Sequence, residues 1–513
     1  MYKIILAGII FCGLLLNPYF FATSDHTYKI PFLKAATSGT GLYAKDITVA
    51  MWHEYTSIFP WLIWPLQKIL GFQDAFFLIY ILTQILFYTS IYLLASNIFR
   101  ERFVGLISVA LLLFPKTILG GIETYDSIVE ERTVAMVLFL FAIYLLLKNR
   151  QVLAVILFSL VLNLHFVTFI NGALFLVTIL ILERLEERDG PPLIQRYNHF
   201  IFFLLIGAIP FVIMKVASCA SSNLLTMVDP MWLKMILVRS PEHFLPDGKA
   251  LGIFMLNTVP ILVLGLGLYM MRDCNVKQGL RIFLASLMAT AVGYCLAWFF
   301  LLRFPLLIGI QCCFLRASYF QGVFSQMMWA YIIYVVFNRV ALCLPFFNNS
   351  VRSGILFVMI FVLCLGLTHH TRVRLSGPGI KGDSPTKKLQ IWLKEHTIQD
   401  ALVITPSYAW NQDFRVFSER ATLGSWKDWT YNCLDRKFAD KMYQRLKDVG
   451  NISLENPAQN DLGKMEEYYL SLKENNWAQI ARKYGADYLV MERQRQLALK
   501  KVYEDRAYTI YKF

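Results

Sequence analysis

The chain has few charged residues for its length. Only 16% of its 513 residues are Asp, Glu, Lys or Arg, whereas a typical soluble protein has about 25%. Hydrophobic residues make up 57% of the sequence. This composition excludes a single soluble domain, a disordered chain and a small disulfide-stabilised scaffold, and it favours a membrane protein.

Sequence motifs for several common chemistries are also absent. No CxxC pair with metal-ligand spacing occurs, and residues 371–513 contain one cysteine, Cys433, so no disulfide can form within that part. The chain has no GxSxG element of a serine hydrolase and no HExxH pair of a metalloprotease. No Walker motif opens a predicted helix of the C-terminal part, so nucleotide binding has no support.

The charged residues are distributed unevenly along the chain. Residues 371–513 carry 24 basic and 18 acidic side chains, whereas the first 370 residues carry only 25 and 17. We therefore predict a transmembrane domain over residues 1–370 and a soluble α/β domain over residues 371–513. The net charge of +14 does not indicate a nucleic-acid partner, because the charges of the C-terminal part are interleaved in sign and no nucleic-acid motif occurs.

Long apolar runs fill the first part. A membrane-spanning helix needs roughly 20 apolar residues, and runs of about that length predict a polytopic α-helical membrane bundle of about eleven spans. The runs begin near Ile4, Ala75, Val104, Thr133, Val152, Ile170, Phe200, Gly252, Phe283, Tyr319 and Ile355. Residues 152–182 fit either two short helices or one broken helix. Residues 59–72, with two Pro and two Trp, favour an interfacial segment.

Basic residues recur in alternate connections between the apolar runs, as Lys and Arg do on the cytoplasmic side of a membrane. This pattern places residues 22–58, 121–131, 219–251 and 302–318 outside. An odd number of spans places the C-terminal domain outside as well. We expect a multi-pass protein of the cell (inner) membrane with an extracytoplasmic C-terminal domain, whose first apolar run is an uncleaved helix rather than a secretory signal.

The C-terminal part has the pattern of a small α/β domain. A helix over Lys387–Glu395 is followed by a short apolar strand over Ala401–Thr405. A second helix over Glu466–Tyr484 then leads into a strand over Tyr488–Met491. The order strand, helix, strand predicts a parallel pair.

The first predicted outside loop carries acids and histidines just after the first helix. Asp25 and His26 lie nearest to the end of that helix, and Asp46 lies farther along. A carboxylate at the membrane surface can accept a proton from a hydroxyl nucleophile or hold a divalent cation. The alternative is a solvated loop whose charges have no role. Asp25 is the best candidate, because it is closest to the helix end.

The second predicted outside loop has four acids within nine residues, namely Glu123, Asp126, Glu130 and Glu131. Charge near the hydrocarbon is costly and tends to mark a pathway, an ion or a partner. If the segment is helical, Asp126 and Glu130 share a face, and a cation or Arg132 must compensate for their repulsion. Simple solvation of the loop is the alternative.

Two further polar residues occur within apolar runs. His165 is either a substrate contact or a hydrogen-bonded packing residue. Arg316 enters a late span after apolar side chains, so it needs an anion such as a lipid phosphate, unless it extends to the head groups. In the soluble part, the stretches Asp413–Arg420 and Trp426–Trp429 combine charge with aromatic rings, which suits either a sugar or packing on a membrane.

Together these stretches resemble the GT-C superfamily of integral membrane glycosyltransferases, and more closely uncharacterised bacterial membrane proteins of that architecture. The stretches that carry the resemblance are Asp25–His26, Leu42–Asp46, Glu131–Ala135, Asn163–His165 and Tyr484–Val490. The resemblance implies transfer of a sugar from a polyprenyl-phosphate donor, with inversion of the anomeric centre. The acceptor would be an envelope glycan or lipid at the outer face of the membrane, and the partners would be membrane lipids and the lipid-linked donor.

The resemblance also implies roles for individual residues. By position, Asp25 would be the general base, accompanied by the second-loop acids Asp126, Glu130 and Glu131. Substrate contacts would come from His26, Asp46, His165 and Arg316, the last of these to a phosphate.

Some features of the family are missing. The second loop has no DxD, and the soluble domain has no WWDxG. These absences argue against protein N-glycosylation and leave a requirement for a divalent cation open. A transporter or flippase of lipid-linked precursors and a non-enzymatic membrane scaffold are the alternative hypotheses.

Overall fold

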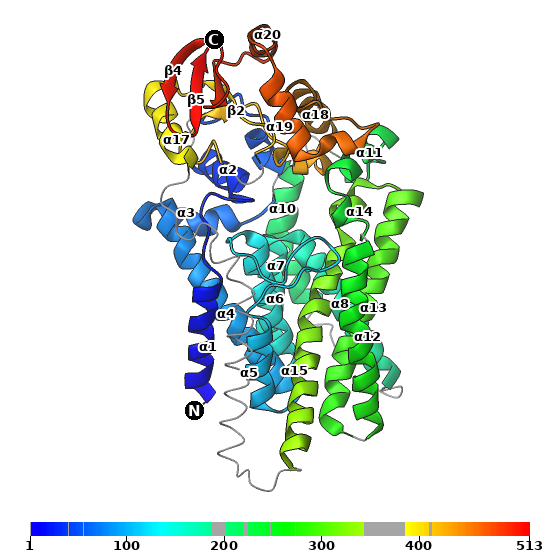
Figure 1. Cartoon of the computed structure of the whole chain (residues 1–513). Coiled ribbons are helices and arrows are strands. Elements are labelled where there is room, and N and C mark those ends of the chain that lie inside the picture. Colours follow the sequence, from blue (N-terminus) through cyan, green and yellow to red (C-terminus); the bar gives the residue numbers. More distant parts are fainter. Residues whose placement is uncertain are drawn as a thin grey trace.

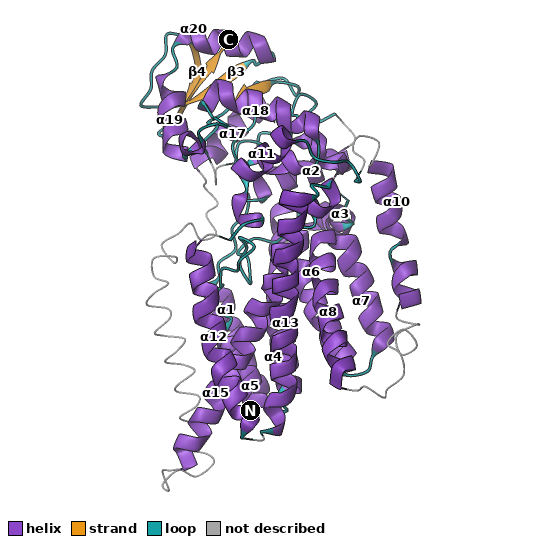
Figure 2. Cartoon of the chain, turned by 90° about the vertical axis from the view of Figure 1, so that its right-hand side faces the viewer, coloured by secondary structure: helices purple, strands orange, loops and turns teal. Residues whose placement is uncertain are grey.

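The computed structural model describes residues 2–38, 41–54, 56–186, 201–218, 224–246, 248–271, 273–342, 385–409 and 413–513. Within these residues, a bundle of helices carries a small α/β domain at one end (Figure 1). The N-terminus lies at the opposite end of the bundle (Figure 2). The predicted span near Ile355 and the predicted domain boundary at residue 370 lie outside the described residues.

The bundle is built from helices of very different lengths. In chain order they are α1 (Tyr2–Leu16), α2 (His26–Ser38), α3 (Phe59–Leu70), α4 (Phe72–Ile98), α5 (Arg102–Leu111), α6 (Glu131–Leu147), α7 (Gln151–Leu164), α8 (Phe166–Glu186), α10 (Ile209–Ser218), α11 (Pro230–Arg239), α12 (Gly248–Met270), α13 (Cys274–Trp298), α14 (Leu307–Gln311) and α15 (Ser318–Leu342). Short turns of 3-10 or π helix lie between them, namely η1 (Val49–Glu54), η2 (Pro241–His243), η3 (Phe299–Arg303) and η4 (Phe314–Ala317).

Five helical stretches among the described residues are long and apolar enough to cross a membrane. They are Phe72–Ile98, Phe166–Glu186, Pro241–Met270, Asn275–Arg303 and Leu307–Arg339. Four further apolar helices are shorter: Tyr2–Leu16, Arg102–Leu111, Gln151–Leu164 and Ile201–Val216. The structure therefore supports a membrane protein, but it does not support the predicted number of about eleven spans.

The difference arises because the length of an apolar run does not show where its helix ends. The run that begins near Val104 leaves the helix after Leu111, and Pro115 prevents it from continuing. The run over residues 152–182 is two helices, α7 and α8, which are separated at His165. The segment over residues 59–72 contains α3, whose Trp61 and Trp64 are exposed, as the interfacial interpretation requires.

Aromatic side chains hold the centre of the bundle together. The ring of Phe139 on α6 packs against Phe158 on α7 and Phe320 on α15, with centroid distances of 5.0 and 4.9 Å. Gly172 on α8 permits this packing, because a Cβ atom there would lie 2.0 Å from the Phe139 ring. Helix α8 thus approaches α6 closely, which fixes the position of the residues at its start.

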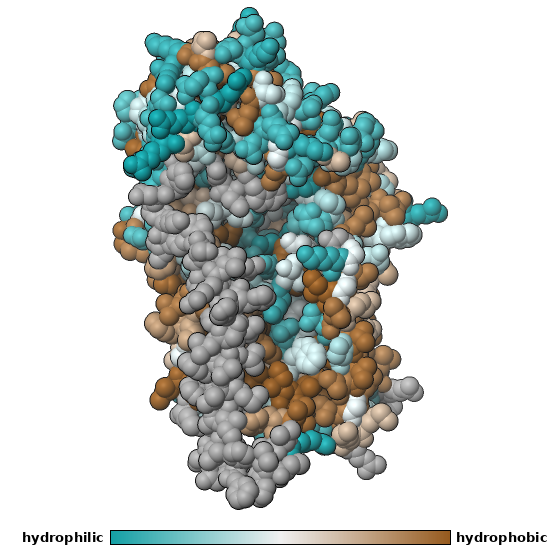
Figure 3. All heavy atoms as spheres, viewed as in Figure 1, coloured by the Kyte–Doolittle hydropathy of each residue, from teal (hydrophilic) through white to brown (hydrophobic). Residues whose placement is uncertain are grey.

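The surface of the molecule changes character along its length. Exposed apolar side chains cover the bundle, whereas the surface of the C-terminal domain is mostly hydrophilic (Figure 3). An exposed apolar surface of this extent is consistent with a surface that lipid covers. The boundary between these two surfaces is where a head group would lie.

The C-terminal domain contains helices and a small sheet. Its elements are α17 (Pro385–His396), β1 (Leu402–Ile404), β2 (Ala421–Thr422), η5 (Asp428–Cys433), α18 (Arg436–Gly450), η6 (Pro457–Asn460), α19 (Leu462–Ser471), α20 (Glu474–Tyr484), β3 (Tyr488–Glu492), β4 (Lys500–Glu504) and β5 (Tyr508–Lys512). The strand order is β2-β1-β3-β5-β4. Strand β1 is parallel to β2 and β3, and β5 is antiparallel to β3 and β4.

The predicted parallel pair is confirmed, with Val403 opposite Tyr488. Successive residues of a strand point to opposite faces, and helices cover both faces here. Leu402 and Leu489 belong to an apolar cluster with Trp477 of α20, whereas Val403 belongs to a second cluster with Leu389 of α17. The predicted helix over residues 466–484 is two helices, α19 and α20.

A further apolar cluster joins the domain to the bundle. Tyr28 of α2 packs edge-on against Tyr431 of η5, with a centroid distance of 4.9 Å. The indole nitrogen of Trp232 on α11 donates to the carbonyl of Asn432 at 2.6 Å, and the Asn432 amide donates to the carbonyl of Met235 at 2.9 Å. The predicted first loop, residues 22–58, therefore contains helix α2, whose first half is buried and contacts the C-terminal domain.

Candidate functional site

A cavity of about 670 Å³ lies where the bundle meets the C-terminal domain. We call it the junction cavity. Its wall comes from the start of α2, the segment before α6, the break between α7 and α8, the region from α11 to η2, the region from α14 to η4, and η5. Six of the eight predicted site residues line it, namely Asp25, Asp126, Glu130, Glu131, His165 and Arg316. His26 and Asp46 do not.

Asp25 stands immediately before α2. The chain turns sharply there, since Ala22 and Ser24 have positive φ angles of 59° and 49°. The Asp25 Oδ1 atom forms an ion pair with the ammonium of Lys427, from the C-terminal domain, at 2.7 Å. Burial by itself would raise the pKa of Asp25, but the charges of Lys427, Lys29 and Arg132 hold it well below its usual range. Asp25 is therefore ionised.

Lys29 lies one helical turn after Asp25 and faces the second loop. Its ammonium forms ion pairs with both Glu130 and Glu131, whose side chains are buried. Burial disfavours the charge on Lys29, but the surrounding carboxylates outweigh this effect and raise its pKa. Glu130 and Glu131 thus anchor α2 to the start of α6.

Asp126 and Glu130 share the guanidinium of Arg132, at 2.9 and 2.5 Å. They do not share a helical face, because the segment before Glu131 is irregular and α6 begins only at Glu131. Burial raises the pKa of Asp126 to about 6, since the Arg132 charge offsets the desolvation only in part and Glu130 adds repulsion. Of the cavity acids with a perturbed pKa, Asp126 titrates nearest to neutrality.

Arg316 enters the junction cavity from η4, directly before the long helix α15. Its Nη2 atom lies 3.4 Å from Nε2 of His243, and its Nε atom is buried with no hydrogen-bond partner. The Nδ1 atom of His243 lies 3.2 Å from the carbonyl of Gly120 and can donate to it, which leaves Nε2 free to accept from Arg316. Among the described residues, Arg316 has no carboxylate within ion-pair distance, unlike Lys29 and Arg132.

His165 lies between α7 and α8, not within a helix as its apolar surroundings had indicated. Its Nδ1 atom accepts from the backbone N–H of Thr168 at 3.1 Å and is 2.8 Å from the Thr168 hydroxyl. The side chain therefore caps the start of α8 while the ring borders the junction cavity.

His26 is fully buried beside the junction cavity rather than in its wall. Its Nε2 atom bonds the carbonyl of Val129 at 2.8 Å, and the rings of Tyr19, Phe21 and Phe76 surround it. Burial lowers the pKa of His26 to about 4, so the ring is neutral near pH 7. The predicted substrate contact is, in the structure, a packing residue that ties α2 to the second loop.

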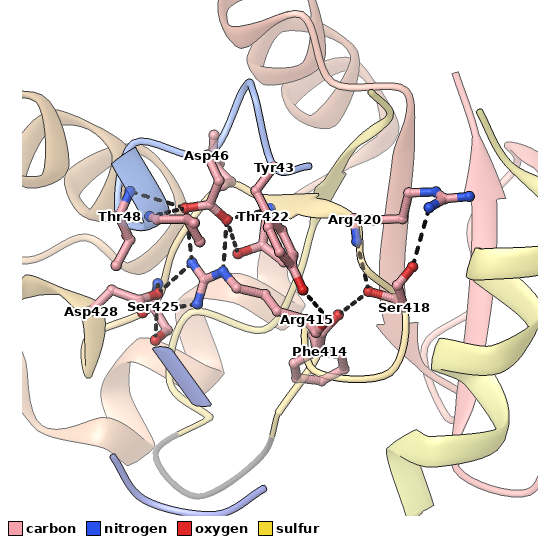
Figure 4. A network of polar contacts seen from close by, with 12 residues as sticks. Tyr43, Asp46, Thr48, Phe414, Arg415, Ser418, Arg420, Thr422, Ser425 and Asp428 are labelled. Atoms are coloured by element: carbon pink, nitrogen blue, oxygen red, sulfur yellow. Dashed lines mark hydrogen bonds and ion pairs between the residues drawn. The ribbon is translucent and has the colours of Figure 1, made fainter. Parts of the chain in front are cut away.

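Asp46 lies in a separate buried cluster, formed by Asp46, Arg415 and Asp428 and called here the Asp46 cluster (Figure 4). The Nε atom of Arg415 donates to Asp46 at 2.7 Å, and its two terminal nitrogens donate to Asp428 at 2.9 and 3.0 Å. Asp46 also accepts from the backbone N–H groups of Thr48 and Thr422, at 3.0 and 2.9 Å. This cluster binds the segment after α2 to the C-terminal domain, so the Asp46 carboxylate is occupied by protein groups.

Sequence reasoning missed the part of the wall that the C-terminal domain supplies. Lys427 and Thr430 line the junction cavity, and so do Arg239 and His243 from the bundle. The combination of charged and aromatic residues in Trp426–Trp429 singled out the segment that contains Lys427. It did not indicate that Lys427 pairs with Asp25.

A metal-binding arrangement is not evident in the described part of the chain, where no group of three or more His, Cys, Asp or Glu side chains could hold an ion. The second-loop acids are instead paired with Lys29 and Arg132.

Comparison with protein families identifies a similar domain. Residues 384–448 match a family described as a domain of unknown function (DUF6798). The matched region runs from α17 to α18 and includes Arg415, Lys427 and Asp428. No curated protein matches the chain.

Proposed function

We propose that the protein is an integral membrane glycosyltransferase that moves a sugar from a polyprenyl-phosphate donor to an acceptor hydroxyl. The observation that carries the proposal is that Asp25, the second-loop acids and Arg316 line one cavity. This cavity lies between an apolar bundle that suits a lipid tail and a hydrophilic domain that suits a glycan (Figure 3). The resemblance to the GT-C superfamily supplies the reaction class.

In the proposed reaction, the Asp25 carboxylate accepts the proton of the acceptor hydroxyl as its oxygen attacks the anomeric carbon. The new C–O bond forms on the face opposite the leaving group, which inverts the anomeric centre. The bond between the anomeric carbon and the phosphate oxygen breaks, and its electron pair leaves with the polyprenyl phosphate. Arg316, which has no carboxylate partner among the described residues, stabilises the charge that develops on the phosphate.

The same proposal assigns the protein to the cell (inner) membrane with the junction cavity at the outer face. The uneven placement of Lys and Arg between the apolar runs supports this orientation. A lipid-linked donor would then lie with its tail against the exposed apolar side chains of the bundle and its head group in the cavity.

The test uses the purified full chain in liposomes with a polyprenyl-phosphate hexose, and it compares Asp25→Asn and Arg316→Ala with the unchanged protein. We expect Asp25→Asn to reduce glycoside formation by about 10² to 10⁴-fold and Arg316→Ala to reduce it by about tenfold or more. Asp440→Asn, on the exposed side of α18, is the matched control.

Full glycoside formation by a folded Asp25→Asn variant would remove Asp25 from the catalytic role. Movement of the labelled lipid across the bilayer without any glycoside would favour the flippase hypothesis instead.

A further inference from the structure

The ion pair between Asp25 and Lys427 hinders the Asp25 carboxylate from acting as the general base of the proposed reaction. The two atoms are 2.7 Å apart, and both side chains are mostly buried in the wall of the junction cavity. A carboxylate that is paired with an ammonium is a poorer proton acceptor, because the neighbouring charge stabilises its ionised form. In this arrangement Asp25 is therefore masked by a residue of the other domain.

The cations of the junction cavity differ in how firmly they are held. Lys29 and Arg132 each contact two carboxylates of the second loop. Arg239 donates to the carbonyl of Trp426 at 2.8 Å and to the hydroxyl of Thr430 at 2.5 Å, so it supports the segment around Lys427. These three side chains act as parts of the scaffold.

The backbone at Lys427 is held by its neighbours, whereas its side chain extends to the Asp25 carboxylate at the cavity wall. Asp428, the next residue, is held by Arg415 and accepts from the backbone N–H of Ser425 at 2.6 Å. Arg239 also contacts the carbonyl of Lys427 at 3.4 Å. The ammonium stands on a flexible four-carbon stem, so it can change partners without movement of the domain.

We propose that Lys427 is a phosphate-sensing residue that leaves Asp25 for the phosphate of the incoming donor, so that Asp25 becomes a competent base only when the donor is bound. The inference rests on the proposed function, since it assigns the head group that the site takes. Arg316 is the second cation for the same phosphate, because its Nε atom is buried without a partner.

This exchange makes Asp25 and the phosphate competitors for one ammonium. Removing the Asp25 charge should therefore release Lys427 and strengthen phosphate binding, whereas removing Lys427 should weaken it. If Lys427 only fixes the position of Asp25, each change alters phosphate binding through its own charge, independently of the other. The coupling between the two substitutions therefore separates these two roles.

The experiment measures binding of polyprenyl monophosphate to the full chain in nanodiscs. We expect Asp25→Asn to bind several-fold more tightly and Lys427→Met to bind at least about tenfold more weakly. Asp25→Asn should have no effect in the Lys427→Met background, and Lys427→Arg should restore binding in part. Lys437→Met, an exposed lysine of α18, is the matched control.

Unchanged or weaker binding by Asp25→Asn overturns the inference, even if Lys427→Met does not fold. Inorganic phosphate is titrated as a second arm, and we expect the same order of variants with weaker binding, because it makes no contact with the apolar bundle. The reverse order of variants also overturns the inference.

The two proposals fail in different ways. If Asp25→Asn abolishes transfer but leaves phosphate binding unchanged, the exchange is wrong and the glycosyltransferase proposal stands. If phosphate binding follows the expected order but no glycoside forms with the unchanged protein, the glycosyltransferase proposal is wrong and Lys427 remains part of an anion site.

Discussion

Two buried ionic clusters lie within one protein, and they differ in how completely their polar atoms are satisfied. In the Asp46 cluster, Arg415 is enclosed by two carboxylates that also accept backbone N–H groups. Around the junction cavity, Arg316 keeps a buried Nε atom without a partner, and Asp25 lines the cavity while it forms an ion pair with Lys427. Complete satisfaction indicates a structural role, whereas incomplete satisfaction beside a cavity indicates a place for a ligand.

The largest effect on stability is expected from Arg415→Met. The substitution leaves Asp46 and Asp428 buried without their counter-charge, which should cost about 3–5 kcal/mol. Thermal unfolding of the purified protein measures the loss, with Arg493→Met on the exposed side of the domain as the control. A variant as stable as the unchanged protein would show that water reaches this cluster, and the contrast between the clusters would then disappear.

An intermediate, pH-dependent effect is expected from Asp126→Asn. Because the pKa of Asp126 is raised from 3.8 to about 6 in the folded state, folding favours its protonated form, so stability falls as the pH rises between these two values and the loss is complete above them. The variant should therefore unfold at a higher temperature than the unchanged protein at pH 8, and this difference should vanish near pH 4. An equal difference at both pH values would mean that burial does not perturb Asp126.

The smallest effect is expected from Lys234→Met. Lys234 of α11 pairs with Glu455 of the C-terminal domain at 2.7 Å, and both side chains are largely exposed. An exposed pair contributes no more than about 1 kcal/mol, so the unfolding temperature should hardly change. A loss as large as that of Arg415→Met would show that exposed pairs also hold the two domains together.

The division into two domains could be predicted because it follows from composition. The charge density changes sharply between the two parts of the chain, and the order of strand and helix in residues 401–491 led to the parallel pair of β1 and β3. Polar residues beside apolar runs were also informative. Asp25, Asp126 and Arg316 line one cavity because water and polar groups gather where the helices of the bundle end.

The remaining features depend on contacts that no local pattern contains. Arg415 lies 369 residues after Asp46, and nothing near either residue indicates the other. His26 and Asp25 are neighbours in sequence, but the first turn of α2 points one into the core and the other into the cavity. The predicted number of spans is not supported, because hydropathy does not register where a helix ends, as α5 does at Leu111 within a longer apolar run.

The wall of the junction cavity has a consequence for how the protein is made. Its residues range from Phe20 to Leu434, so the wall cannot be complete until the segment around Leu434 has left the ribosome. The helices can insert in the bilayer before the C-terminal domain docks. The ion pair of Asp25 with Lys427 and the ring contact of Tyr431 with Tyr28 of α2 form only when that domain docks. The junction cavity is therefore complete only after the C-terminal domain has docked on the bundle.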